Sequence, residues 1–192
     1  MRPMAKFLIG TLSALMMGCG GGGQSDPLAD GWNHFTSGLY QEAHASFVSA
    51  VESGNNEGYT GLGWVCIDLD SIPEADRYFG LAAAGNFVDG YAGWSAVLWA
   101  RENYSDCITK AGFVLQNEPA YSFDFRPTVN YQDMLWYQAS SYLHLGNFSQ
   151  CLERIQELDG GFTTDVNAVN AGDLLAAKLE TLAGQLAKQM RR

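Results

Sequence analysis

The sequence has few of the residues that catalytic and metal sites use. It contains three histidines and four cysteines in 192 residues, and these form neither an H-x-x-x-H nor a C-x-x-C spacing. It also has no G-x-S-x-G or Walker sequence, and we interpret its glycine run, residues 20–23, as a linker and not as a nucleotide-binding loop. The sequence therefore predicts no catalytic residue, no metal site and no cofactor, and leaves an enzyme as a remote alternative.

Basic residues are also scarce. Eleven lysines and arginines stand against 21 aspartates and glutamates, so the formal net charge is −10. An acidic surface repels phosphate backbones and anionic lipids, which argues against a nucleic-acid partner and favours a neutral or cationic one. The hydrophobic content of 47% and the charged content of 17% are typical of a folded globular chain.

Long apolar runs are absent beyond the first residues of the chain. Arg2 and Lys6 precede an apolar stretch over residues 7–17. A membrane-spanning helix needs ~20 apolar residues, so this stretch is too short to be one. A basic start followed by a short apolar core is typical of a secretory signal peptide, which we place at residues 1–18.

The end of that segment resembles a bacterial lipobox. The sequence Leu15-Met16-Met17-Gly18-Cys19 has the required cysteine after a small residue, although Met16 and Met17 depart from the usual pattern. The resemblance implies that Cys19 is lipidated, with residues 19–27 as a glycine-rich tether. No aspartate follows Cys19, which in such proteins implies the periplasmic face of the outer membrane. The alternative is an ordinary cleaved signal with an incidental cysteine.

An internal repeat dominates the rest of the chain. A large residue, a small residue and two apolar residues recur at spacings of three, four and three, which places all four on one face of a helix. The first three copies follow one another at equal intervals, and the fourth comes after a longer interval. The copies are Tyr40-Ala43-Phe47-Ala50, Ile72-Ala75-Phe79-Ala82, Tyr104-Cys107-Ala111-Val114 and Phe148-Cys151-Ile155-Leu158.

The segment in front of each copy repeats as well. Residues 57–63 are echoed by residues 89–95 at the same interval, with matching apolar and small positions. Each unit therefore consists of two helices, and Gly63 and Ala139 allow the two helices of a pair to approach closely.

These features resemble the tetratricopeptide repeat, whose pattern is carried by Leu62-Gly63, by Gly38-Leu39-Tyr40 and by Ala43, Phe47 and Ala50, with Pro119 behind. The resemblance implies an all-α, right-handed superhelical solenoid of about four helical hairpins and a C-terminal capping helix. The units are slightly shorter than is usual in the family, and Asp30-Gly31 occupies the Leu-Gly place of the first unit. A different two-helix solenoid, such as a Sel1-like array, is the alternative. We place the repeats at residues 28–160, divided into 28–55, 56–87, 88–119 and 131–160, and the capping helix and tail at residues 161–192.

Six large apolar residues on the front helices are offset from the columns that face the partner helix. In this family that offset implies the concave surface, which binds an extended peptide or a helix. We predict a binding groove from Trp32, Phe35, Trp64, Ile67, Trp99 and Trp136. The alternative is that these residues fill the interior of the superhelix or the gap between helices.

The longer interval before the fourth copy leaves an insertion at residues 117–131. Pro119 and Pro127 exclude a regular helix through it. Its aromatic residues alternate with polar ones, which predicts an extended flap with one aromatic, adhesive face. The flap residues are Tyr121, Phe123, Phe125, Arg126 and Tyr131. The alternative is a loop that packs its rings on the neighbouring repeats.

Together these features predict a lipid-anchored scaffold of the cell envelope that binds a protein or peptide and touches the membrane through its lipid alone. A receptor that stacks glycans or another small ligand on the same rings is the alternative. The three cysteines that follow Cys19, at positions 66, 107 and 151, are predicted to be small buried hydrophobes.

Overall fold

The computed structural model describes residues 26–189, and within them the chain forms nine α-helices. The predicted signal peptide, Cys19 and most of the tether lie outside the described residues. No helix among the described residues has the length and apolar character needed to cross a membrane. The helices are α1 (Pro27–Thr36), α2 (Tyr40–Glu52), α3 (Gly58–Asp68), α4 (Ile72–Ala83), α5 (Val88–Ala100), α6 (Tyr104–Asn117), α7 (Tyr131–His144), α8 (Phe148–Leu158) and α9 (Ala171–Gln189).

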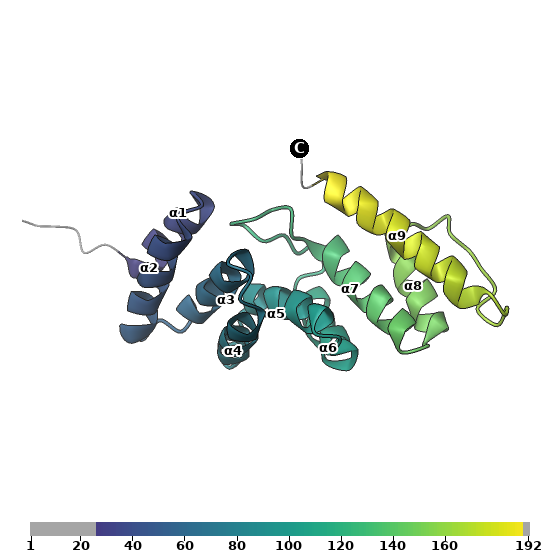
Figure 1. The fold of residues 1–192 in the computed structure, drawn as a ribbon, viewed down its shortest axis with the longest axis horizontal. Helices are drawn as coiled ribbons and strands as arrows, with labels where there is room; N and C mark the ends of the chain where they lie inside the picture. Colours follow the sequence, from purple (N-terminus) through teal and green to yellow (C-terminus); the bar gives the residue numbers. More distant parts are fainter. Residues whose placement is uncertain (1–25, 190–192) are drawn as a thin grey trace, which may run out of the picture.

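The helices pack in the order of the chain and build an arch of helical hairpins (Figure 1). Helices α1 and α2, α3 and α4, α5 and α6, and α7 and α8 form the four pairs, and α9 packs against α7 and α8. The front helices α1, α3, α5 and α7 also contact one another in sequence, so they form one continuous layer, whose side away from the back helices we call the inner face. The predicted all-α repeat solenoid with a closing helix is confirmed.

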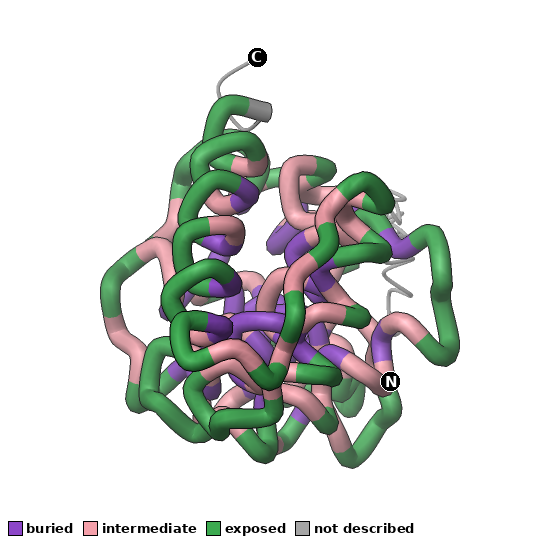
Figure 2. The backbone as a smooth tube through the Cα atoms, turned by 90° about the vertical axis from the view of Figure 1, so that its right-hand side faces the viewer, coloured by how far each residue is buried: buried purple, intermediate pink, exposed green. Residues whose placement is uncertain are grey.

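The repeated columns form the core between the two layers. Ala43, Phe47, Ala75, Phe79, Cys107, Ala111, Cys151 and Ile155 are each 0% exposed. In Figure 2 the buried stretches lie where the helices face one another, and the exposed stretches lie on the outside. A repeat of this kind is stable only because each hairpin covers the apolar face of the next one.

Two glycines show how closely the front helices approach the aromatic columns. A Cβ atom added at Gly63 would lie 2.5 Å from Cε1 of Phe79, and one added at Gly31 would lie 2.5 Å from Cδ1 of Phe47. In the sequence, Asp30-Gly31 is a weak point of the first unit. The structure shows that the first unit does follow the pattern at this position. The missing side chain of Gly31 leaves space for the Phe47 ring, just as that of Gly63 leaves space for the Phe79 ring.

Two helix starts have the residue spacing of a capping box, Ser71 with Glu74 and Asn147 with Gln150, but lack its hydrogen bonds. Ser71 and Asn147 start α4 and α8, but neither side chain caps its helix; the Ser71 hydroxyl bonds the Glu74 carboxylate instead. The one capping box in residues 26–189 lies at the start of α7, where Asn130 accepts from the Gln132 N–H at 2.9 Å and Asp133 accepts from the Asn130 N–H at 2.9 Å. This box fixes the point at which the insertion ends.

The closing helix begins at Ala171, after turns over residues 165–170. Its apolar stripe packs inward, with Leu175, Leu179 and Leu182 buried. Lys178, which the helical pattern places on the outer side, is an exception, because its side chain is only 15% exposed and pairs with Asp159.

Candidate functional site

The insertion between α6 and α7 folds as an irregular two-armed loop. Its arms meet in an antiparallel bridge between Ser122 and Asn130. The Phe123 N–H donates to the Val129 carbonyl at 2.9 Å, and the Tyr131 N–H donates to the Tyr121 carbonyl at 2.8 Å. The side chains alternate along the first arm, with Tyr121 and Phe123 buried and the residues after each of them exposed.

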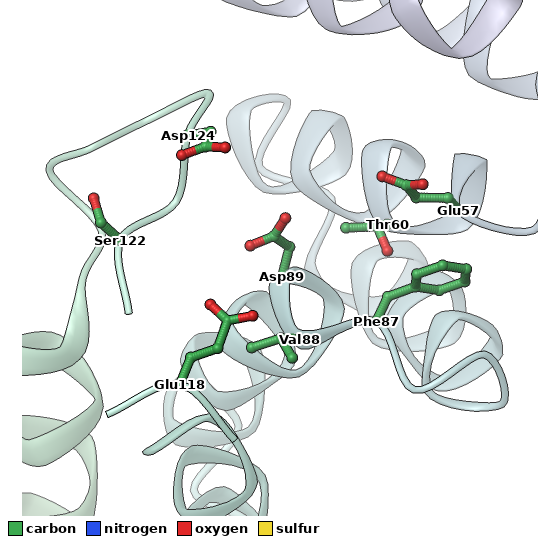
Figure 3. Close-up of a pocket in the computed structure, with 8 residues that line it drawn as sticks. All are labelled: Glu57, Thr60, Phe87, Val88, Asp89, Glu118, Ser122 and Asp124. Atoms are coloured by element: carbon green, nitrogen blue, oxygen red, sulfur yellow. The ribbon is translucent and has the colours of Figure 1, made fainter. Parts of the chain in front are cut away.

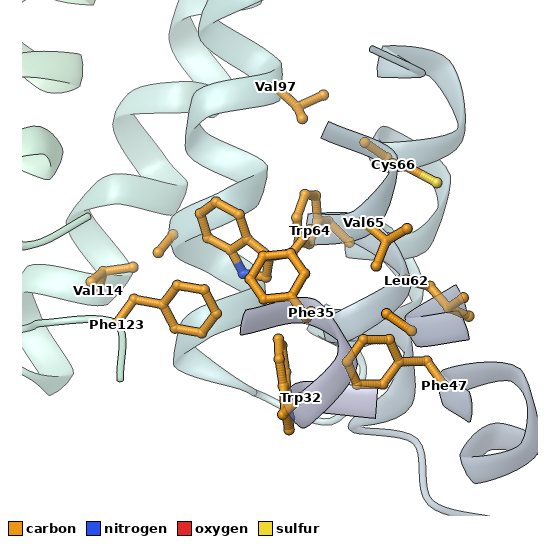
Figure 4. Close-up of a cluster of buried hydrophobic side chains, with 14 of the residues drawn as sticks. Trp32, Phe35, Phe47, Leu62, Trp64, Val65, Cys66, Val97, Val114 and Phe123 are labelled. Carbon is orange, nitrogen blue, oxygen red and sulfur yellow. The ribbon is translucent and has the colours of Figure 1, made fainter. Parts of the chain in front are cut away.

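The buried rings of the insertion pack on the N-terminal half of the inner face (Figure 4). Phe125 stacks on Trp32 with ring centroids 4.2 Å apart and an interplanar angle of 4°. Phe123 stacks on Trp64 at 4.7 Å and meets Trp32 edge-on at 5.6 Å. The exposed fractions are only 4% for Trp32, 4% for Phe35 and 3% for Trp64. In this half of the inner face, Trp32, Phe35 and Trp64 are therefore packed against the insertion and do not line a free groove. Such packing is the alternative that the sequence analysis left open.

Arg126 fastens the tip of the insertion to α3. Its guanidinium group pairs with Asp68 at the end of α3. The same group lies 5.0 Å from the ring centroid of Phe35 and 5.7 Å from that of Trp64. An ion pair over aromatic faces adds direction to a contact that is otherwise apolar.

Beyond the insertion, the inner face contains two neighbouring cavities that share Asp133 and Tyr137, and we call them the inner-face cavities. The first has a volume of about 170 Å³ and is lined by Trp64, Ile67, Ala92, Ala96, Arg126, Val129, Asp133 and Tyr137. The second has a volume of about 230 Å³ and is lined by Trp99, Asp133, Trp136, Tyr137, Ala183, Leu186 and Ala187. Four of the six predicted groove residues thus border them, whereas Trp32 and Phe35 do not.

The tryptophans of the second cavity are held by hydrogen bonds to the protein itself. The Trp99 indole N–H donates to the Ser140 hydroxyl at 3.0 Å, and the Trp136 indole N–H donates to the Leu179 carbonyl at 3.0 Å. Their ring centroids lie 5.1 Å apart. Because the polar atoms of both indoles are already satisfied, the cavity offers rigid apolar ring surfaces that suit an apolar side chain.

The ionisable groups of the cavities serve the fold. Asp133 is 9% exposed and belongs to the capping box of α7. Burial raises the pKa of its carboxyl group, while the backbone N–H groups of Asn130 and Asp133 oppose that rise. Burial also raises the pKa of the Tyr137 hydroxyl well above its ordinary value, so this group stays protonated. Neither residue is paired with a nucleophile, which makes a binding role better supported than a chemical one.

The cysteines and histidines of residues 26–189 lie apart from the cavities. Cys66, Cys107 and Cys151 are free and buried, as predicted, and burial raises the pKa of the Cys107 thiol to about 11. His34 contacts the Ser46 hydroxyl, and His144 stacks on Tyr104. Within the described part of the chain no three histidine, cysteine or acidic side chains are grouped so that they could hold a metal ion.

Sequence reasoning missed part of this site. The sequence analysis did not include Asp133 or Tyr137 among the groove residues. Tyr137 directly follows Trp136 on α7, and Asp133 lies one helical turn before them. Ala183, Leu186 and Ala187 were assigned only a capping role, because nothing local in their sequence shows that α9 lies against the inner side of α7. The flap residue Tyr131 lies at the start of α7, is 39% exposed, and does not join the other rings on the inner face.

Two solved structures have a similar fold. One is a tetratricopeptide repeat protein from Parabacteroides merdae ATCC 43184, 16% identical in sequence; the match covers 86% of this chain and 66% of that one, with a TM-score of 0.57. The other is MamA MSR-1 C2, 12% identical, with 85% of this chain and 95% of that chain covered and a TM-score of 0.58. This chain thus spans just under two thirds of the length of the Parabacteroides protein.

At the level of sequence, no family model and no curated protein matches the chain. The similarity to these two structures is therefore a similarity of fold. Together with the four helical hairpins and the closing helix, they show that the chain has the all-α helical-repeat fold of tetratricopeptide repeat proteins.

Proposed function

We propose that this chain is a protein-binding scaffold that receives apolar side chains of a partner in its inner-face cavities. The observation that carries this proposal is the pair of neighbouring cavities. The first, about 170 Å³, lies between α3, α5, α7 and the insertion, and the second, about 230 Å³, lies between α5, α7 and α9. Their walls include the rings of Trp64, Trp99 and Trp136, whose indole N–H groups each donate a hydrogen bond to another part of the protein, and the ring of Tyr137. Rigid aromatic walls around a small apolar cavity are typical of the places where a few partner side chains supply most of the binding energy.

The partner is an extended peptide or a helix that crosses the open half of the inner face. The N-terminal half is filled by the insertion, so a ligand enters next to Arg126 and runs toward α9. Two apolar side chains, one for each cavity, match the space available. A glycan is less suited, because the indole N–H groups that would donate to sugar hydroxyls already bond Ser140 and Leu179.

The absence of a catalytic role is part of the same proposal. In and around the cavities, Asp133 serves a helix cap and Arg126 pairs with Asp68. A general base or nucleophile needs a free, positioned side chain, and the described residues lining the cavities do not present one.

The proposed localisation in the cell rests on the N-terminal sequence. We infer that residues 1–18 are removed, that Cys19 carries a lipid, and that residues 20–23 tether the repeats to the periplasmic face of the outer membrane. Intact-mass measurement of the chain purified from membranes tests this inference. A mass that starts at Cys19 with added acyl chains supports it, and a Cys19→Ser chain should leave the membrane fraction. A native chain that is unacylated and released in the same way as Cys19→Ser would contradict it.

The binding role is tested by affinity capture from envelope extract. The baits are the native chain, a Trp99→Ala/Trp136→Ala variant and a Leu81→Ala control, since Leu81 is 41% exposed on the back helix α4. Circular dichroism first establishes that all three baits are folded. A protein retained by the native and control chains but lost with the double variant supports the scaffold. Retention by all three would show that the cavities are not the binding site, and Trp quenching by soluble oligosaccharides alone would favour the glycan.

A further inference from the structure

The two inner-face cavities meet at one acidic residue, Asp133, which together with Tyr137 lines both of them. The first cavity is also bordered by α3 and the insertion, and the second by α9. The other described residues that line the cavities are apolar or aromatic, apart from Arg126. A ligand that occupies both cavities therefore passes the Asp133 carboxylate on its way from one to the other.

Only one carboxylate oxygen of Asp133 is used by the helix cap. The Oδ2 atom accepts from the Asn130 N–H at 2.9 Å, whereas the Oδ1 atom accepts no hydrogen bond from residues 26–189. Three side-chain polar atoms in this part of the chain are both unpartnered and closed off from solvent, and they belong to Trp32, Thr60 and Ser141. Asp133 Oδ1 is not one of them. It therefore remains accessible, although the residue as a whole is only 9% exposed.

The charge of Asp133 has no basic partner among the described residues. None of the ion pairs within residues 26–189 includes it. Arg126, the basic residue of the first cavity, pairs with Asp68, and no lysine, arginine or histidine lines the second cavity. Burial raises the pKa of the Asp133 carboxyl group, and the groups that oppose this rise are backbone N–H groups. A cation next to Asp133 Oδ1 would therefore stabilise a charge that the fold leaves uncompensated.

The surroundings of the cavities are acidic as well. On the other side of the insertion, four carboxylates gather around a third cavity of about 230 Å³ (Figure 3). They belong to Glu57, Asp89, Glu118 and Asp124, and none of the eight described residues that line this third cavity is basic. The formal net charge of the whole chain is −10. The field near the inner face therefore favours the approach of a basic segment over that of an acidic one.

We propose that the partner segment bound in the inner-face cavities carries a basic side chain, lysine or arginine, between the two apolar side chains that enter the cavities. This inference rests on the proposed function, because it concerns the ligand of the same cavities. The basic group donates a hydrogen bond to Asp133 Oδ1, and its methylene groups lie against the aromatic walls. A charge-assisted hydrogen bond is about twice as strong as a neutral one. An acidic side chain in the same place is disfavoured, because it would bring two carboxylates together away from water.

Selection of peptides from a phage-displayed library of random dodecapeptides tests the inference. The native full-length chain is the target, and the Trp99→Ala/Trp136→Ala variant removes peptides that bind elsewhere. We expect the peptides that need the two tryptophans to share a lysine or arginine with an apolar residue on either side. A spacing of two residues between these positions would identify an extended ligand, because alternate side chains of a strand point to the same side. A spacing of three or four would identify a helix.

A double-mutant cycle assigns the basic side chain to its partner on the protein. Asp133→Asn removes the charge but keeps an acceptor for the Asn130 N–H, so the capping box can persist; circular dichroism checks that the variant is folded. In fluorescence anisotropy with a selected peptide, Asp133→Asn should weaken binding about tenfold, and so should glutamine in place of the basic residue of the peptide. The two changes together should weaken binding little more than either one alone.

Asp124→Asn is the matched control. It removes the same charge at an exposed position of the insertion that lines neither inner-face cavity. It should change the affinity by less than about twofold, because a solvent-exposed charge away from the contact contributes little. The tenfold effect of glutamine in the peptide should remain with this variant.

The possible failures can be told apart. Peptides that need both tryptophans but share no basic residue, or whose basic residue is not coupled to Asp133, would overturn this inference and leave the proposed function standing. Enrichment of acidic residues would also contradict it and would point to Arg126. Equal weakening by Asp133→Asn and Asp124→Asn would show only a response to net charge. If no peptide distinguishes the native chain from the tryptophan variant, the proposed function is wrong, and this inference with it.

Discussion

The insertion is a structural part of the domain, and Phe123→Ala tests this most strongly. Phe123 is 0% exposed and stacks on Trp64 at 4.7 Å, with Trp32 and Phe125 at 5.6 and 5.7 Å. Removal of a buried phenylalanine ring costs about 3–5 kcal/mol in a core that does not collapse around the gap. Part of that cost is the loss of aromatic pairs, each about 0.5–1.5 kcal/mol.

The structure sets a limit on this loss. The insertion is joined to α6 and α7 at its two ends, and it can lose its contacts with α1 and α3 while the hairpins stay folded. The measured loss of stability then cannot exceed the free energy with which the insertion docks on α1 and α3. We therefore expect a loss of about 3 kcal/mol, at the lower end of the range for a buried ring, together with greater access of solvent to Trp32 and Trp64.

Urea unfolding followed by tryptophan fluorescence and by circular dichroism gives the free energy of unfolding, and acrylamide quenching reports the exposure of the tryptophans. Tyr131→Ala is the matched control, because Tyr131 is an aromatic residue at the base of the insertion that is 39% exposed; its loss should be below about 1 kcal/mol. A loss for Phe123→Ala no larger than that of Tyr131→Ala, with unchanged quenching, would show that the insertion does not pack on the inner face.

Two further perturbations follow from the structure. Gly63→Ala places a Cβ atom 2.5 Å from the Phe79 ring and should destabilise the domain by about 1–3 kcal/mol, whereas Gly184→Ala, with nothing within 4 Å, should be neutral or stabilising in thermal unfolding. Burial raises the pKa of Asp89 from 3.8 to about 6, so the stability that comes from its protonation is present below pH ~4 and is lost as the pH rises through 6. Asp89 Oδ1 accepts a hydrogen bond from the Tyr121 hydroxyl at 2.9 Å, and Asp89→Asn keeps an acceptor for Tyr121 but cannot ionise. It should be about 1–2 kcal/mol more stable than the native chain at pH 7.5 and equal to it near pH 4, since the full effect of about 3 kcal/mol is reduced by the partial exposure of the side chain; equal stability at both pH values would contradict this reasoning.

Much of the fold follows from local spacing. Phe47 and Phe79 occupy equivalent positions in successive repeats, and a residue that recurs at one helical phase in successive units must face the same layer. The same logic did not recognise Gly31, because its neighbour Asp30 does not resemble the leucine of the family pattern. The requirement at that position is steric, however, and glycine alone satisfies it.

The site was predictable only in part. The sequence identified the front-helix face that carries Trp64, Trp99 and Trp136, because that face is fixed by helical phase. It did not determine which stretch of that face the insertion covers. That depends on contacts between residues as far apart as Trp32 and Phe125, and no local spacing records such contacts.

The central claim is that a partner binds in the inner-face cavities, and filling one of them tests it most directly. Ala187 is exposed on α9 and lines the second cavity, so Ala187→Trp fills that space without removing any existing packing. Gln185→Trp adds the same side chain at a nearby position of α9 that does not line the cavity. With the captured partner, fluorescence anisotropy should show that Ala187→Trp weakens binding at least tenfold while Gln185→Trp binds as the native chain does. Equal affinities for the native chain and both variants would show that the partner binds elsewhere.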